Sequence, residues 1–116
     1  MIYRKAIDIK FPGEPHAAWG NATIYVEIAD DHYATRHVVL FENGWALRYD
    51  RINWLDGIDS LAAARYAPAR WRKTWGQDYP SDSTEFNNSW VSASKAPNQP
   101  QSYLDYGPWP ILRRIQ

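Results

Sequence analysis

The chain has 116 residues, no net formal charge and no cysteine. A chain of this length fits one domain, residues 1–116, and can bury one core without metal or disulfide staples. The neutral charge excludes a general electrostatic attraction to nucleic acid, and the absence of cysteine excludes disulfides and thiolate chemistry.

Two further features of the composition set expectations. Aromatic residues make up 16% of the chain, including seven Trp, and large aromatic side chains dominate cores and interfaces. No apolar run approaches the ~20 residues of a membrane span, and no signal-like apolar segment follows Met1. We therefore expect a cytoplasmic protein that makes no membrane contact.

Four segments alternate apolar and polar residues, which is the pattern of strands with two unlike faces. Turn-forming residues separate them, among them Asp30-Asp31 and Asn43-Gly44. Consecutive short strands joined by such turns predict an antiparallel sheet. The four expected strands are residues 2–11, 23–29, 33–42 and 45–51.

The Asn43-Gly44 pair predicts a two-residue type I′ hairpin, which fixes how the third and fourth strands pair. In that register Leu40 faces Leu47, and His37 faces Asp50. One face would carry Tyr25, Val38, Leu40, Trp45, Leu47 and Tyr49, and the other Ile24, Val26, His37, Val39, Phe41, Ala46, Arg48 and Asp50. Because neither face is fully polar, we expect both to be at least partly covered.

The second half of the chain is expected to contain short helices. Asp59 or Ser60 could cap a helix over residues 61–66, and Pro68 would end it. Trp71 and Trp75 are four residues apart and could share one helical face, with Gly76 ending that segment.

A further helix is predicted at Asp82, because Asp82 and Glu85 have the spacing of a capping box. It would run to about Ala93 with Phe86 and Trp90 on one face. Residues 94–103 are rich in Pro, Asn, Gln and Ser and are expected to be irregular. The apolar residues that follow, Trp109, Ile111 and Leu112, predict that the tail packs on the body of the protein.

These elements predict an α+β fold. It would consist of a twisted antiparallel sheet of about four strands, two or three short helices and an irregular packed C-terminal tail. Within the single domain, residues 2–51 would form the sheet and residues 55–116 the helical and tail region.

About half of the chain resembles a small bacterial domain family of unknown function. The family pattern is an Ile-Tyr-x-Glu strand, an acidic turn, an Arg-x-Val strand, a Phe–Asn–Gly turn and a Glu-Phe-x-x-x-Trp helix. The matching segments are Ile24-Tyr25-Val26-Glu27, Asp30-Asp31-His32-Tyr33, Arg36-His37-Val38, Phe41-Glu42-Asn43-Gly44 and Glu85-Phe86-Asn87-Asn88-Ser89-Trp90. The chain departs from the pattern between Trp54 and Pro80 and after Ser94. The resemblance implies no activity, but it suggests an immunity or accessory role in toxin or phage-conflict loci.

The sequence predicts no metal site and no cofactor. His16, His32 and His37 lie in a loop, a turn and a strand, whereas zinc sites need three or four convergent ligands. The acidic turn at Asp30-Asp31 is better explained by turn formation. No Gly-rich phosphate loop and no pair of carboxylates stand out.

The expected His37–Asp50 pair is the one candidate for catalysis. An Asp can fix the tautomer of a His and raise its basicity, as in general-base dyads. Arg48 on the same face could bind an anion. The alternative is an ordinary cross-strand pair, and no nucleophile accompanies the dyad.

Residues 65–75 interleave four basic residues with three aromatic residues. Arg and Trp dominate the hot spots of protein interfaces, and they also stack on bases and sugars. The alternative is that Trp71 and Trp75 fill the core. The candidate binding residues of the chain are Trp45, Arg48, Trp54, Arg70, Trp71 and Trp75.

The function predicted first is a non-catalytic protein that binds a protein partner. The second is a small-molecule binder that stacks a nucleotide or sugar on Trp and Arg, which a pocket near Arg48 and Trp71 would favour. The third is an enzyme that uses His37 and Asp50.

Overall fold

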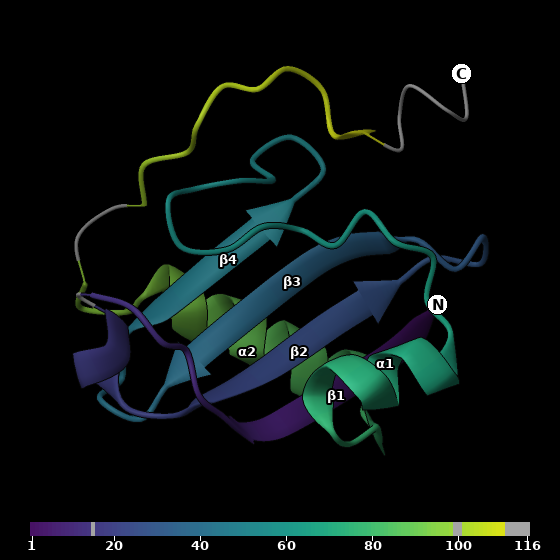
Figure 1. Cartoon of the computed structure of the whole chain (residues 1–116), viewed down its shortest axis with the longest axis horizontal. Helices are drawn as coiled ribbons and strands as arrows, with labels where there is room; N and C mark the ends of the chain where they lie inside the picture. The colour runs from purple at the N-terminus through teal and green to yellow at the C-terminus, as the bar shows by residue number, and fades with distance from the viewer. Residues whose placement is uncertain (15, 99–100, 111–116) are drawn as a thin grey trace.

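The centre of the computed structural model is a five-stranded antiparallel sheet with the strand order β4-β3-β2-β1-β5 (Figure 1). The structure describes residues 1–14, 16–98 and 101–110. The strands are β1 (Ile2–Ile9), β2 (Ala22–Ile28), β3 (Ala34–Phe41), β4 (Ala46–Asp50) and β5 (Tyr79–Pro80). The helices are the 3₁₀ helix η1 (His16–Trp19) and the α-helices α1 (Pro68–Trp75) and α2 (Ser83–Ser94). The predicted antiparallel sheet with helices is confirmed, and β5 adds a fifth strand.

The two faces of the sheet are covered by different parts of the chain. Helix α2 lies behind strands β2, β3 and β4 in Figure 1, and the segment after β4 crosses in front of them. On the front face, Leu61 and Trp109 join the buried side chains of the sheet, such as Ile24 and Tyr49. We call the front side the core face and the α2 side the helix face.

The hairpin between β3 and β4 differs from the prediction by one residue. Val39 pairs with Leu47, and His37 pairs with Tyr49. The loop has three residues because Phe41 N–H donates to the Trp45 carbonyl, and Gly44 N–H donates to the Phe41 carbonyl. A type I turn followed by a left-handed Gly is the usual three-residue hairpin, whereas the predicted type I′ turn has a two-residue loop.

The slip exchanges the faces of every residue in β4 relative to β3. Leu47 and Tyr49 lie on the core face with His37 and Val39, whereas Arg48 pairs with Val38. The predicted faces of β2 and β3 are confirmed, since Tyr25 pairs with Val38 and Ile24 with Val39.

The helix predicted over residues 61–66 is wrong, because this segment is irregular. Pro68 does not end a helix. It stands at the first position of α1, where its missing N–H costs no hydrogen bond. The C-terminus of α1 is as predicted, because Gly76 adopts a left-handed conformation with φ 74° and its N–H donates to the Arg72 carbonyl.

Helix α2 follows the prediction closely. The Asp82 carboxylate accepts a hydrogen bond from Glu85 N–H at 2.8 Å and caps the helix. Phe86 and Trp90 lie on one face and stack with ring centroids 6.3 Å apart. Phe86 is fully buried against the helix face.

The tail packs on the body as predicted as far as it is described, since Trp109 is fully buried. Asn98 and Gln101 cover the edge strand β4, because their amides bond the backbone of Ala46 and Arg48. Ile111 and Leu112, which were also expected to pack, lie outside the described residues. Within residues 1–14, 16–98 and 101–110, no helix is long and apolar enough to span a membrane.

Candidate functional site

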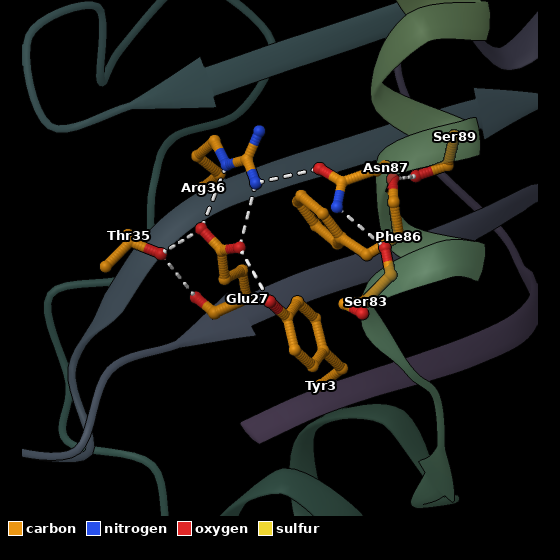
Figure 2. Close-up of polar contacts among 8 residues, drawn as sticks. All are labelled: Tyr3, Glu27, Thr35, Arg36, Ser83, Phe86, Asn87 and Ser89. Carbon is orange, nitrogen blue, oxygen red and sulfur yellow. Dashed lines mark hydrogen bonds and ion pairs between the residues drawn. The ribbon is translucent and has the colours of Figure 1, made fainter. Parts of the chain in front are cut away.

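The helix face carries a buried carboxylate that is fully satisfied (Figure 2). Glu27 is 5% exposed. Its oxygens accept hydrogen bonds from Tyr3 Oη, Thr35 Oγ1 and the Nε and Nη2 of Arg36, at 2.7 to 3.1 Å. These contacts outweigh desolvation and lower the pKa of Glu27 to about 2. With every acceptor occupied, this cluster is suited to hold the strands and α2 together and leaves no group free for a ligand.

The core face contains a different kind of site, a mostly apolar cavity of about 140 Å³. It lies between strands β2 and β3, residues 62–67 and helix α1. Its lining residues are Val26, Ile28, Ala34, His37, Ala62, Ala64, Arg65, Tyr66, Ala67, Arg70, Trp71, Thr74 and Trp75. Several of them, including Arg65, Arg70 and Thr74, are exposed, so the cavity reaches the surface beside α1.

Three aromatic rings form the wall of the cavity that faces the sheet. The Tyr66 and Trp71 rings meet edge to face with centroids 5.9 Å apart, and the Trp71 and Trp75 rings are 6.1 Å apart. Asp78 anchors this wall to the sheet, because it accepts hydrogen bonds from Tyr66 Oη at 2.9 Å and Arg4 Nε at 2.6 Å. The wall therefore has a fixed position even though α1 has no fully buried residue.

Two buried polar groups among the lining residues have no hydrogen-bond partner. His37 is 4% exposed; no hydrogen bond of good geometry reaches its ring nitrogens, which lie near the Ser60 backbone and, for Nε2, 3.8 Å from Asp59 Oδ2. The indole Nε1 of Trp71 is also buried and unpartnered. An orphaned buried polar group costs ~1–3 kcal/mol, so a ligand that bonded either group would recover part of that cost.

The charge on His37 is controlled by its burial. Desolvation lowers the pKa of His37, although the Asp59 carboxylate, whose Oδ2 lies 3.8 Å from His37 Nε2, opposes the shift. The ring is therefore neutral near pH 7 and offers one donor and one acceptor.

The predicted His37–Asp50 dyad does not form. Because the hairpin is shifted by one residue, Asp50 pairs with Arg36 and points to the opposite side of the sheet from His37. The Asp50 carboxylate instead accepts hydrogen bonds from the N–H groups of Ile52 and Asn53. This arrangement contradicts the general-base mechanism that the sequence suggested.

The six predicted binding residues divide into two groups. Arg70, Trp71 and Trp75 line the cavity. The others lie elsewhere and do not meet one another. Trp45 packs on Trp19, Arg48 lies over the Trp90 ring at 5.0 Å on the helix face, and Trp54 donates its indole N–H to the Gly107 carbonyl.

Sequence reasoning missed the small residues that leave space for the cavity. Ala62, Ala64 and Ala67 line it, whereas an alanine-rich run by itself favours a helix. The signal that could have been used is Pro68, which favours an extended conformation in the residue before it. Ala67 has φ −143° and ψ 130°, so the segment enters α1 extended.

Metal binding finds no support in the described part of the chain, where no group of three His, Cys, Asp or Glu residues could hold an ion. Comparison of the chain with protein-family models, curated proteins and solved structures found no match.

Proposed function

We propose that the protein binds a small aromatic molecule in the cavity on the core face. The observation that carries the proposal is one apolar cavity lined by three aromatic rings and by two buried polar groups, His37 and Trp71, that lack partners. Ligand sites commonly combine an apolar lining with a few polar groups that fix orientation.

The size of the cavity limits the ligand. Its volume of about 140 Å³ is close to that of apolar cavities that hold a benzene molecule. Sites for drug-sized ligands are larger, roughly 300–1,000 Å³. A single aromatic ring with small substituents fits, whereas a whole nucleotide or an oligosaccharide does not.

Thermal unfolding with phenol as the probe tests this proposal. Phenol should raise the melting temperature in a concentration-dependent manner, because a ligand that binds only the native state stabilises it. Ala67→Leu should abolish the effect by filling the cavity. Ala67 makes no side-chain cap bond, so the change removes no hydrogen bond.

Ala69→Leu is the matched control, since Ala69 is exposed on α1 and does not line the cavity. This variant should respond to phenol like the original protein. If phenol gives no stabilisation of the original protein, or stabilises both variants equally, the cavity is not a binding site for aromatic molecules.

A protein partner is the second candidate function. The cavity opens beside Arg65 and Arg70, and its volume also suits the ring of one Phe or Tyr side chain of a partner. Trp71 and Trp75 are half-buried and contact the core, so alanine at these positions tests folding and binding together. Ala67→Leu is the better test, because it should block an inserted side chain without removing a Trp.

A further inference from the structure

The mouth of the cavity concentrates positive charge. Arg65 and Arg70 line it and are exposed, and Arg70 Nη1 donates to the Arg65 carbonyl at 2.7 Å, which holds the two residues together. Among the described residues, neither guanidinium has a carboxylate within 4.0 Å, although four other ion pairs are present. The chain as a whole has no net charge, so this local excess is a property of the mouth.

The position of these charges on α1 is opposite to what a helix prefers. Cations stabilise the C-terminal end of a helix and anions the N-terminal end. Arg72 and Lys73 in the last turn follow the rule, but Arg70 lies in the first turn, where no acidic residue is present. Ala67 at the N-cap offers no oxygen to the first N–H groups either. An anion at the mouth would pair with the guanidinium groups and would also interact favourably with the N-terminal end of α1.

The cavity thus offers three zones to a ligand. Strand β3 contributes neutral His37, Tyr66 and helix α1 contribute the aromatic rings, and the exposed residues Arg65 and Arg70 contribute positive charge. A complementary ligand has a small polar group at one end, an aromatic ring in the middle and a negative charge at the other end.

We infer that the ligand is a small aromatic acid whose ring occupies the cavity and whose anionic group is held by Arg65 and Arg70. This inference rests on the proposed function, because it requires that the cavity bind an aromatic ring. A hydroxyl or similar group on the far side of the ring would bond His37. The charge-assisted bonds at the mouth would give the acid its advantage over a neutral analogue.

Calorimetric titration with two matched probes tests the inference. The probes are 4-hydroxybenzoate and its neutral counterpart 4-hydroxybenzyl alcohol, which share the ring and the phenol group. At low salt the acid should bind about tenfold more tightly, as expected for two partly screened charge contacts. The double variant Arg65→Gln/Arg70→Gln should reduce that ratio to about one while it still binds the alcohol.

The control is Arg72→Gln/Lys73→Gln, which removes the same net charge from residues of α1 that do not line the cavity. It should keep most of the preference for the acid. Equal binding of both probes to the original protein, or a preference that survives in the Arg65/Arg70 variant, would overturn the inference and leave the proposed function standing. If neither these probes nor phenol binds, the proposed function itself fails.

Discussion

His37 is buried for a reason that packing alone does not supply. It lies on the core face opposite Tyr49, with ring centroids 5.5 Å apart, and its Nε2 lies 3.8 Å from the Asp59 carboxylate, beyond hydrogen-bond distance. A Leu at this position would fill a similar volume without an orphaned polar group. A residue that costs stability where an apolar one would serve is typical of a functional position.

Replacing His37 with Leu should therefore stabilise the ligand-free protein by about 1 kcal/mol at pH 7.5 and abolish phenol binding. The gain should grow as the pH falls below about 6.5. The pKa of His37 is lowered in the folded state, so the unfolded chain takes up the proton first and folding becomes less favourable in acid. Urea unfolding at pH 7.5 and 5.5 measures both effects.

His16→Gln is the control for this comparison, because His16 lies on η1 outside the cavity and bonds the Pro12 carbonyl. Its pH dependence should match that of the original protein. A less stable His37→Leu protein that still binds phenol would show that His37 has a structural role only.

Glu27 differs from His37 because its hydrogen bonds stabilise the charged form of a buried side chain. Only desolvation opposes that form. A pKa lowered from 4.5 to about 2 corresponds to roughly 3 kcal/mol of stability. That contribution is complete above about pH 4.5 and is lost as the pH falls toward 2. Acid therefore weakens the contact between the strands and α2.

Glu27→Gln should lower the free energy of unfolding at pH 7 by about 2–3 kcal/mol, because Arg36 loses its charged partner and stays half-buried. The variant should also lose less stability than the original protein between pH 4.5 and pH 2.5. Glu14→Gln, at an exposed position, should change neither quantity. Equal acid sensitivity of the Glu27 variant and the original protein would refute the assigned role.

At the scale of elements, the two hairpins around β3 have the same construction. Ala29 N–H donates to the Tyr33 carbonyl and His32 N–H to the Ala29 carbonyl, which repeats the pattern of Phe41, Gly44 and Trp45. The last loop residue is left-handed in both, with φ 71° at His32 and 89° at Gly44. One hairpin fills this position with Gly, whereas the other uses a residue that has a Cβ.

Substitutions at these two left-handed positions should change the free energy of unfolding in opposite directions. His32→Gly should raise the free energy of unfolding by about 0.5 kcal/mol, because relief of the left-handed strain exceeds the added entropy of the unfolded chain. Gly44→Ala should lower it by about 1 kcal/mol, since the new Cβ meets no atom within 4 Å and only the backbone strain remains. Denaturant unfolding measures both changes.

His32→Ala controls for loss of the imidazole, because it keeps a Cβ at the strained position. It should give no stabilisation. A gain from Ala equal to that from Gly would mean that the side chain, and not the backbone conformation, causes the strain.

The two hairpins around β3 show what could be predicted from the sequence and what could not. The alternation of residues 23–29 and 33–42 predicted correctly which residues of β2 and β3 share a face. Asn43-Gly44 is compatible with loops of two and of three residues, and the sequence does not decide between them. The extra loop residue shifts β4 by one position relative to the prediction. Asp50 therefore does not face His37, and the predicted dyad does not form.

At the scale of the whole molecule, the many aromatic side chains lie in several different places. Trp109 fills the core, Trp90 stacks on Phe86 over the helix face, and Trp71 and Trp75 form the cavity wall. The local pattern predicted the sheet, α1 and α2, but it could not predict the cavity. The cavity depends on where an irregular segment, residues 62–67, lies over strands distant in sequence.

The seven Trp indole N–H groups allow the most direct test of the cavity as a ligand site. In a two-dimensional ¹H–¹⁵N spectrum recorded during titration with phenol, the Trp71 resonance should move most and that of Trp75 next. The resonances of Trp54 and Trp109, whose N–H groups already bond the Gly107 and Leu61 carbonyls, should stay in place. Unchanged resonances at Trp71, or the largest shift at Trp45 or Trp54, would contradict the proposed site.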